Sequence, residues 1–416
     1  MINLEIGGDV SMHLTNIPQE FKDALPILEQ IREAGFEAYF VGGSVRDTLL
    51  KLSIHDVDIA TSAYPAEVKE IFEHTVDTGI QHGTVMVLDH GEGYETTTFR
   101  TESGYQDFRR PDKVEFVRSL KEDLKRRDLT INAFALAPDG EVIDMFSGMD
   151  DLKNKTLRAV GDPNERFHED ALRMMRTVRF ASQLDFSIEE NTLEAIRQNA
   201  PLLEKIAVER IQVEWVKLLL GKNVLQGLKA FLETGLYQYC PQLANKQDSL
   251  EELASLEKLE LANETAAWTL LTYSFDLDQE QIKRFLKAWK TSNELINEVQ
   301  NATFILQQIN KDQLTAFDCY KAGENAVDAA SQILDIFAFA LSSTELKAMY
   351  RKLPIKDKHE LQLNGKDLIK DLNIKPSKEF GEILNKIEHD VVSGLIANDH
   401  DMLLTYAQKL VSEGLY

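Results

Sequence analysis

The fold of this chain is decided by one short stretch, Ala38-Tyr39-Phe40-Val41-Gly42-Gly43-Ser44-Val45-Arg46-Asp47. Its apolar start, over residues 37–41, is typical of a strand, and the glycine pair is typical of a turn into a helix that Ser44 opens. Two glycines let the backbone approach a ligand, and free N–H groups at a helix start favour phosphate. Arg46, one turn into the helix, is placed to contact the same anion. The alternative is a tight strand–helix turn in which Arg46 and Asp47 pair with neighbours.

Two aspartates follow this turn at a spacing that suits a metal ion. Asp56 and Asp58 lie in the strand-like run at residues 55–61, and Asp56 comes ten residues after Arg46. Alternate strand residues face the same way, so both carboxylates are expected on one face. Such carboxylates, together with substrate phosphates, suit Mg²⁺. The alternative for an isolated Asp-x-Asp is an ordinary surface strand.

Glu95 lies in a further strand-like run and completes a carboxylate trio if the two strands are neighbours. We therefore predict Asp56, Asp58 and Glu95 as catalytic residues, with Asp56 and Asp58 as the metal ligands. Two metal ions held there would activate a terminal hydroxyl and stabilise a leaving pyrophosphate.

The first third of the chain is predicted to be an α+β head with a mixed sheet of about five strands. Helical periodicity covers residues 18–34, and Pro138-Asp139-Gly140 is a strong turn signal between two strand-like runs. The strand-like runs lie at residues 37–41, 55–61, 84–88, 94–99, 114–117 and 141–144.

Beyond about residue 150, amphipathic helical patterns replace the strand signals, so neck, body and tail domains are expected to be all-α. Met12 is an alternative start, which makes residues 1–11 a candidate unstructured extension. The predicted domains are a head at 12–155, a neck at 156–222, a body at 223–318 and a tail at 319–416. The helical patterns cover residues 168–183, 189–199, 207–220, 224–234, 264–274, 279–290, 293–309, 327–340, 379–393 and 399–412.

The bulk composition fits a multidomain protein of a reducing compartment. The chain has 416 residues, 43% of them hydrophobic, which predicts several domains with cores of their own. Cys240 and Cys319 are far apart and in no metal-type spacing, which excludes a disulfide framework or a zinc ribbon. No apolar run reaches the ~18 residues of a membrane span, and the N-terminus lacks a secretion-signal pattern. We expect a cytoplasmic protein that contacts no membrane.

The net charge of −23 at first sight argues against a nucleic-acid partner. The basic residues are clustered, however, with eight Lys/Arg in residues 109–127 and nine against four acidic residues in 347–378. Acidic residues are dense in 246–280 instead. Basic patches on an acidic body can bind RNA phosphates in a salt-sensitive manner, and the alternative is that they are solvated faces.

These motifs together resemble the class II tRNA nucleotidyltransferases of the polymerase-β-like superfamily. Residues 42–47 with 56–61 are similar to the first family motif, and residues 126–133 (Arg-Arg-Asp-Leu-Thr-Ile-Asn-Ala) are similar to the second, where an arginine holds the nucleotide. On this basis Arg127 contacts the nucleotide, while Arg126 stays on the surface and Asp128 caps a helix near Thr130. Further matches are Asp162-Pro163, Arg166-Phe167, residues 169–173, 209–214, 364–369 and 381–384.

The resemblance implies an elongated, Mg²⁺-dependent enzyme that adds CCA to the tRNA 3′ end from CTP and ATP. Asp170 and Arg173, i and i+3 on a predicted helix, are neighbours that offer an acceptor and a donor. Cytosine and adenine present an amino donor beside a ring-nitrogen acceptor, whereas uracil and guanine present the reverse pair. One Asp/Arg pair can thus accept C and A and reject U and G. The alternative is a simple salt bridge between the two.

The same helix carries Arg176 and Arg179, which the resemblance assigns to the nucleotide site together with Gly43 and Arg46. Helical geometry keeps Arg176 near Arg173 but turns Arg179 away, so a salt bridge to the head is the alternative for Arg179.

Residues 100–113 carry charges, Gly and Pro, and as a bare sequence they indicate a flexible surface connection. The resemblance implies a loop that enzymes adding only cytidines lack, which favours full CCA addition or A-addition. An A-adding enzyme, a bacterial poly(A) polymerase and an inactive RNA-binding homologue remain alternatives. The sequence also leaves open a homodimer and the switch from C to A.

Overall fold

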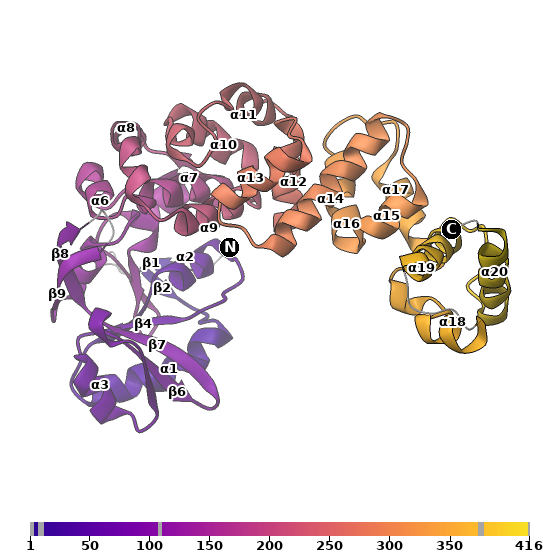
Figure 1. Ribbon diagram of the computed structural model, residues 1–416. Coiled ribbons are helices and arrows are strands. Elements are labelled where there is room, and N and C mark those ends of the chain that lie inside the picture. The colour runs from indigo at the N-terminus through magenta and orange to yellow at the C-terminus, as the bar shows by residue number, and fades with distance from the viewer. Residues whose placement is uncertain (1–3, 7–11, 107–109, 373–377, 415–416) are drawn as a thin grey trace. The chain divides into compact units, whose positions relative to one another are not determined.

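The structure is a computed structural model that describes residues 4–6, 12–106, 110–372 and 378–414. The chain divides into two compact units, Met1–Ser255 and Leu256–Tyr416. This division lies inside the predicted body at 223–318, and the predicted boundaries near 155, 222 and 318 stay predictions. Figure 1 shows a first unit that contains the strands and a second unit built from helices.

Among the described residues, nine strands form a sheet at the centre of the first unit, in the order β1-β2-β11-β10-β3-β4-β7-β6-β5. Strands β4 and β7 pair in parallel and the other neighbours are antiparallel, which confirms the predicted mixed sheet. The strands are β1 (Leu4–Ile6), β2 (Met12–Leu14), β3 (Ala38–Val41), β4 (Asp58–Thr61), β5 (Thr75–Gly79), β6 (Thr84–Asp89), β7 (Glu92–Thr98), β10 (Phe134–Leu136) and β11 (Glu141–Asp144).

The predicted number of five strands is wrong, because four further strands are too short to give a recognisable sequence pattern. Strand β10 is buried along its whole length, and β1, β2 and β5 have three to five residues. A short buried run cannot be told from other buried segments by periodicity. Strand β1, moreover, pairs with β2, so the part of the predicted 1–11 extension at Leu4–Ile6 is a strand rather than unstructured.

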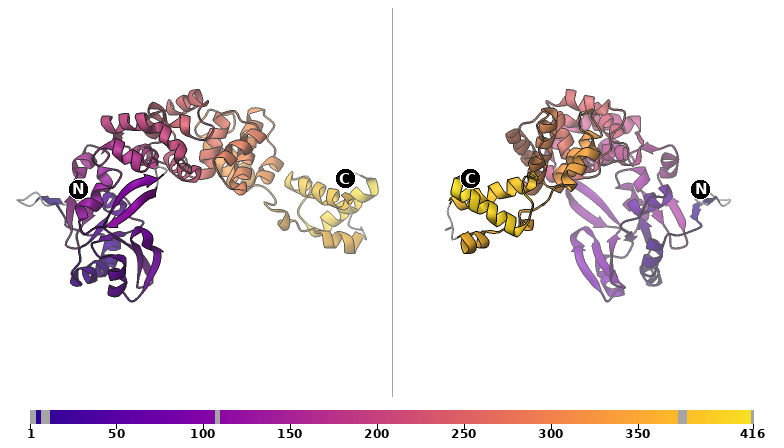
Figure 2. Two further views of the ribbon diagram at one scale, coloured as in Figure 1. Left: turned by 60° about the vertical axis from the view of Figure 1, so that its left-hand side comes forward. Right: turned by 90° about the vertical axis from the view of Figure 1, so that its right-hand side faces the viewer.

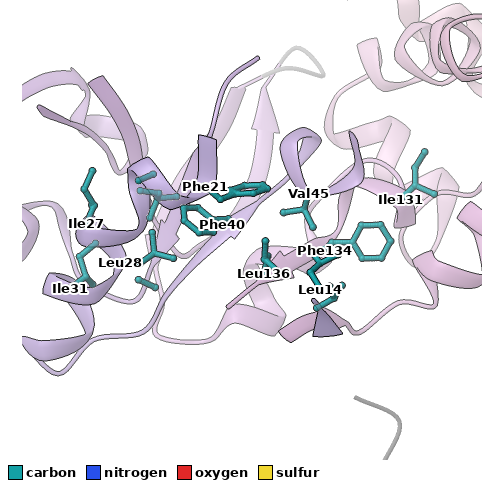
Figure 3. Close-up of a cluster of buried hydrophobic side chains, with 14 of the residues drawn as sticks. Leu14, Phe21, Ile27, Leu28, Ile31, Phe40, Val45, Ile131, Phe134 and Leu136 are labelled. Atoms are coloured by element: carbon teal, nitrogen blue, oxygen red, sulfur yellow. The ribbon is translucent and has the colours of Figure 1, made fainter. Parts of the chain in front are cut away.

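The turn after β3 is held by a hydrophobic core on one face of the sheet. Helix α1 (Gln19–Glu33) buries Phe21 against Phe40 of β3, with ring centroids 4.6 Å apart. Helix α2 (Gly43–Leu50) inserts Val45 beside the strand residue Leu136, as Figure 3 shows. Packing therefore fixes both the strand that leads into the turn, β3, and the helix that leaves it, α2.

Residues 100–113 are not a simple surface connection. Strands β8 (Arg100–Gln106) and β9 (Arg110–Phe116) form an antiparallel hairpin that pairs Arg100 with Phe116 and Gln106 with Arg110. The predicted strand at 114–117 belongs to this hairpin and not to the main sheet. The tip at 107–109 lies outside the described residues.

The helices after the head agree with the predicted patterns, with three corrections. The helix expected at 327–340 ends early, because α16 covers Glu324–Leu334. The single helix expected at 168–183 is broken, because Asp170 has an extended backbone (φ −139°, ψ 103°) between α6 and α7. The all-helical prediction beyond residue 150 misses a two-residue parallel pair, β12 (Thr156–Leu157) with β13 (Ser187–Ile188). The helices are α3 (Pro65–Ile71), α4 (Leu120–Lys125), α5 (Gly148–Lys153), α6 (Pro163–Glu169), α7 (Leu172–Leu184), α8 (Glu190–Asn199), α9 (Val208–Leu219), α10 (Val224–Glu233) and α11 (Gln247–Ala254).

The second unit shows helices and connections throughout its described part, as both views in Figure 2 illustrate. Across the described residues, no helix is both long enough and apolar enough to span a membrane. The two cysteines are free and buried, one in each unit, as expected without a disulfide framework. The helices are α12 (Glu264–Ser274), α13 (Gln279–Ala288), α14 (Asn293–Asn310), α15 (Ala316–Ala322), α16 (Glu324–Leu334), α17 (Ser343–Arg351), α18 (Gly365–Leu372), α19 (Lys378–Val392) and α20 (His400–Glu413).

Asp390 joins α19 to α20 and makes the stability of the second unit depend on pH. Its side chain is 1% exposed and accepts hydrogen bonds from Lys386 (2.7 Å), Tyr406 (2.6 Å) and His389 (3.1 Å). Burial alone would raise the pKa of Asp390, but these three donors hold that pKa below its usual value. A lowered carboxyl pKa stabilises the fold above the unfolded value, and this stabilisation is lost as the pH falls through the folded value.

We predict that Asp390→Asn lowers the free energy of unfolding of the second unit by about 2 kcal/mol at pH 7. The difference should shrink below about pH 4, where the carboxyl of the unfolded chain is protonated. Urea denaturation at both pH values measures it. Asp401→Asn, at a side chain that is 96% exposed, is the control. An equal loss at both pH values would contradict a role for the charge.

Candidate active site

The glycine turn lies within contact distance of two predicted site residues. Gly42 has φ 79° and ψ −139°, a conformation that favours glycine, and α2 begins at Gly43, one residue before the predicted start. The Ser44 hydroxyl donates to the Val41 carbonyl at 3.2 Å and closes the turn. A Cβ at Gly42 would lie 3.2 Å from Nη1 of Arg127 and 3.6 Å from Oδ2 of Asp58.

The predicted neighbourhood of the two carboxylate strands is confirmed. Strands β4 and β7 are adjacent and parallel, with Ile59 opposite Thr96, so Asp58 and Glu95 face one another one residue earlier. Asp56 lies before β4 rather than in it, so the strand-alternation argument for Asp56 is wrong. Even so, all three carboxylates line one pocket of about 610 Å³.

The electrostatic surroundings of Asp58 include both other carboxylates. Loss of water around Asp58 is the largest cause that raises its pKa, and the charges of Glu95 and Asp56 raise it further. The Arg127 guanidinium opposes them and lowers this pKa. Negative charges that repel one another at a site made of oxygen donors would be stabilised by a hard cation.

A second pocket, of about 680 Å³, lies beside the first and shares Asp56 and Asp58 with it. Its charge is opposite, because it is rich in arginine. All seven predicted nucleotide-binding residues line it, and Glu95 lines only the acidic pocket. The arginines are Arg46, Arg126, Arg127, Arg173, Arg176, Arg179 and Arg210.

Arg46 pairs with neighbouring side chains, as the alternative interpretation of the turn predicted. It nevertheless lines the arginine-rich pocket. Its guanidinium pairs with Asp47 at 2.7 Å and donates to Asn132 at 2.6 Å. Arg179 pairs with Glu214 of α9 at 2.5 Å, so its salt-bridge partner is not in the head. Both guanidinium groups lie over the ring of Phe180, at 4.9 and 3.8 Å from its centroid.

Asp128 has a role that the sequence did not reveal. It accepts from the Leu129 N–H and lies next to a 3₁₀ turn, Thr130–Asn132, yet it is also buried and pairs with Arg176 at 2.7 Å. Burial alone would raise the pKa of Asp128, but Arg176 and Asn132 hold that pKa well below its usual range. Asp128 thus anchors one of the pocket arginines.

Arg126 is not a surface residue, contrary to the prediction. Its side chain is 18% exposed and pairs with Asp123 at 2.7 Å and with Glu102 at 3.4 Å. Arg127 donates to Asp123 and to the Asn132 carbonyl, both at 3.3 Å. The two consecutive arginines therefore share one carboxylate.

Asp170 and Arg173 line the same pocket, but each is held by a different partner. Asp170 pairs with Arg210 of α9 at 2.8 Å, and its Oδ1 accepts from the Leu172 N–H at the start of α7. Arg173 pairs with Glu169 at 2.6 Å and donates to the Arg126 carbonyl at 2.8 Å. The alternative interpretation, a salt bridge between Asp170 and Arg173, is therefore wrong, since each of them pairs with another residue.

The arginine-rich pocket is also lined by residues that were not predicted as site residues, among them Arg126, Asp128, Asn132, Leu172, Phe180, Arg210 and Lys217. Asp128, Asn132 and Arg210 lie in the motif-like segments 126–133 and 209–214, which could have indicated them, whereas the local sequence around Phe180 and Lys217 carries no such signal. Within the described part of the chain, one group brings three metal-type ligands within 4.8 Å of one another, Asp367, Asp371 and His400 of the second unit. The three carboxylates of the head therefore do not converge as closely as that.

The glycine turn, the facing carboxylates and the adjoining arginine pocket define a nucleotidyltransferase. Residues 38–158 match the family model described as the poly A polymerase head domain. Residues 185–247 match a "Probable RNA and SrmB-binding site of polymerase A", and residues 259–407 match tRNA nucleotidyltransferase domain 2.

The relatives identify the family more narrowly. A CCA-adding enzyme of Ligilactobacillus salivarius is 59% identical over 402 residues, 97% of this chain and 100% of that protein. The CCA-adding enzyme of Limosilactobacillus reuteri is 56% identical over 403 residues, again 97% of this chain and 100% of that protein. A crystal structure of the Bacillus stearothermophilus CCA-adding enzyme in complex with CTP has a TM-score of 0.84 and 39% identity, covering 95% of this chain and 99% of that one. The chain belongs to the family of CCA-adding enzymes.

Proposed function

We propose that this protein builds and repairs the 3′-terminal CCA of tRNA from CTP and ATP, without a nucleic-acid template. The observation that carries the proposal is the pair of adjoining pockets, one acidic and one rich in arginine, that share Asp56 and Asp58. Nucleotidyl transfer needs a place for a polyanionic nucleotide beside a place where a hydroxyl is activated. The names of the relatives support the choice of C and A as the added nucleotides.

The arginine-rich pocket binds the nucleoside triphosphate in this proposal. Gly43, at the start of α2, offers its backbone to a phosphate, and Arg46 lies on the same helix. Arg127, Arg176 and Arg179 supply further charge from the other walls. Because Arg46, Arg176 and Arg179 each have a carboxylate partner, their guanidinium groups are fixed before the ligand arrives, which lowers the entropy cost of binding.

Mg²⁺ is the metal that these donors suit best, with Asp56 and Asp58 as its ligands and Glu95 beside them. When bound, two such ions would lower the pKa of the attacking hydroxyl and neutralise the leaving pyrophosphate. Asp58 and Glu95 lie opposite one another on the neighbouring strands β4 and β7. In this proposal the 3′-terminal hydroxyl of the RNA comes to this position, because the metal ions that activate it would be held there.

Asp170 and Arg173 select the base. The carboxylate oxygens of Asp170 can accept from the amino group of cytosine or adenine, and Arg173 can donate to the neighbouring ring nitrogen. Uracil and guanine would place a carbonyl against the carboxylate and an N–H against the guanidinium, which leaves polar groups unpaired. Since the side chains of Asp170 and Arg173 are only 19% and 11% exposed at the pocket wall, water cannot fully compensate for such a mismatch.

The tail at residues 319–416 is proposed to bind the tRNA through its basic segment at 347–378. A cytoplasmic site of action belongs to the same proposal, because two free, buried cysteines suit a reducing compartment.

The decisive experiment offers labelled CTP and ATP, each alone and together, to tRNA that lacks zero, one, two or three terminal nucleotides. We expect CTP on substrates that lack three or two, ATP on the substrate that lacks one, and nothing on complete tRNA. If ATP is incorporated but CTP never is, the chain is an A-adding enzyme. Continued ATP addition would indicate a poly(A) polymerase, and no incorporation would indicate an inactive RNA-binding homologue.

We also predict that Gly42→Ala lowers kcat/KM for both nucleotides at least about tenfold. The new Cβ would be strained at φ 79° and would lie 3.2 Å from the Arg127 guanidinium, which must then move. Steady-state kinetics measures the effect. Gly35→Ala is the matched control, because Gly35 has φ +90° but nothing within 4 Å of its Cβ position. Equal losses of kcat/KM in both variants would contradict a specific role for the turn.

A further inference from the structure

We propose that Asp123 is a positioning residue, which fixes the guanidinium of Arg127 beside Gly42 and thereby sets the affinity for the incoming nucleotide. The inference rests on the proposed function, since it assumes that Arg127 binds that nucleotide. Asp123 itself is not among the described residues that line the arginine-rich pocket, whereas Arg126 and Arg127 are. It therefore acts from behind the pocket wall.

The two oxygens of this carboxylate have different partners. Asp123 lies in the short helix α4, and its side chain is 1% exposed. Oδ1 accepts from Arg126, at 2.7 Å from Nη2 and 3.0 Å from Nε, and from the backbone N–H of Arg100 at 3.3 Å. Oδ2 accepts from Nη2 of Arg127 at 3.3 Å. One oxygen thus holds Arg126 and the base of the β8–β9 hairpin, and the other is directed at Arg127.

The two arginines favour the charged form of this buried carboxylate. Burial would raise the pKa of Asp123, but Arg126 and Arg127 hold that pKa below its usual value. The dependence is mutual, since an arginine at a pocket wall is fixed in place only while a charged partner remains behind it.

The guanidinium of Arg127 lies beside the glycine turn and close enough to Asp58 to affect its pKa. Its Nη1 donates to the Asn132 carbonyl at 3.3 Å and lies 3.2 Å from the position of a Gly42 Cβ. Its charge also lowers the pKa of Asp58. A shift of this guanidinium by a few tenths of an ångström would therefore be felt at both the glycine turn and the carboxylates.

A purely structural role is the competing explanation. Asp123 could serve the hairpin alone, because Arg126 also pairs with Glu102 and Arg100 pairs with Glu102 at 2.8 Å. In that case the loss of Asp123 would act through Arg126 and would not depend on Arg127. The two explanations predict different couplings, which a double-mutant cycle measures directly.

The test compares Asp123→Asn, Arg127→Ala and Arg126→Ala with the doubles Asp123→Asn/Arg127→Ala and Asp123→Asn/Arg126→Ala in the full-length protein. KM and kcat are measured for CTP on tRNA that lacks all three nucleotides and for ATP on tRNA that ends in CC. We expect Asp123→Asn to raise KM for both nucleotides about tenfold with kcat changed less than threefold. The same substitution should add nothing to Arg127→Ala and should still raise KM in the Arg126→Ala background.

Asp390→Asn is the matched control, because Asp390 is also 1% exposed and bonded to basic side chains, but in the second unit. It should lose stability without any change in the nucleotide KM. If Asp123→Asn does not fold, Asp123→Glu keeps the charge and displaces it, and should raise KM more weakly.

Three results would overturn the inference. The first is a rise in KM on adding Asp123→Asn to Arg127→Ala, and the second is no rise in the Arg126→Ala background. The third is an unchanged KM in Arg127→Ala, which would also remove Arg127 from the nucleotide site. The proposed function itself is tested on the unmodified chain and fails if that chain does not add two C and one A to tRNA that lacks all three nucleotides, so the two failures are distinguishable.

Discussion

Asp58→Ala is expected to reduce nucleotide transfer at least about a thousandfold, for CTP and ATP alike, while tRNA binding survives. Asp58 is shared by the two pockets, faces Glu95 across parallel strands and lies 3.6 Å from the Gly42 Cβ position. Loss of this carboxylate would remove a proposed Mg²⁺ ligand, and with it the activation of the hydroxyl. A thousandfold loss corresponds to about 4 kcal/mol of transition-state stabilisation.

Single-turnover kinetics at saturating nucleotide measures the loss, and filter binding of tRNA tests the integrity of the protein. Asp77→Ala is the control, since Asp77 belongs to β5 of the same sheet, is half exposed and pairs with Lys69 at 2.8 Å. Its turnover should stay within twofold of the unmodified protein. Unchanged turnover in Asp58→Ala would remove the metal assignment, whereas joint loss of turnover and tRNA binding would point to misfolding.

The part of the site built on strands could be predicted from the sequence, because strand patterns constrain which residues meet. Asp58 and Glu95 lie in separate strand-like runs, and the structure pairs those runs directly. The local sequence does not show which strands are neighbours. The prediction that Glu95 joins Asp56 and Asp58 therefore depended on a strand pairing that only the structure provides. Asp56 lies outside β4 because the strand is shorter than its apolar pattern indicated.

The neck shows where helical periodicity fails as a guide. A continuous apolar pattern predicted one helix over 168–183, but α6 ends at Glu169 and α7 begins at Leu172. The chain is extended at Asp170, whose Oδ1 accepts from the Leu172 N–H. An aspartate side chain can bond to a nearby backbone N–H and so replace a helical hydrogen bond. The hydrophobic residues on either side of Asp170 still follow a helical spacing in the sequence, so the pattern did not reveal the break.

The carboxylates that pair with the pocket arginines could not be predicted, because they lie far away in the sequence. Arg179 with Glu214 and Arg176 with Asp128 are pairs between elements that lie 35 and 48 residues apart in the chain. Many carboxylates in an acidic chain would be plausible partners, and only tertiary packing selects among them. The sequence could thus nominate the pocket arginines but not the groups that hold them.

Asp170→Ala and Arg173→Ala are expected to loosen the choice of C and A. For each variant, the preference for CTP over UTP on tRNA that lacks all three nucleotides should fall about 10- to 100-fold, in line with the about 1–3 kcal/mol that an unpaired buried polar group costs. ATP over GTP on tRNA ending in CC should fall similarly. Because Arg210 pairs with Asp170 at 2.8 Å, Asp170→Ala also frees a donor at the wall, which should favour uracil and guanine.

Competition assays with pairs of labelled nucleotides measure these ratios directly as kcat/KM quotients, which separates selectivity from loss of overall rate. Arg197→Ala is the matched control, a 41% exposed arginine of α8 in the same unit, paired with Glu233. It should leave both ratios unchanged. A variant that loses rate equally with all four nucleotides would show that Asp170 and Arg173 support binding without reading the base, and unaltered ratios in both variants would refute selection by this pair. A fall in the pyrimidine ratio alone would show that C and A are recognised by different groups, because a single acceptor–donor pair must serve both.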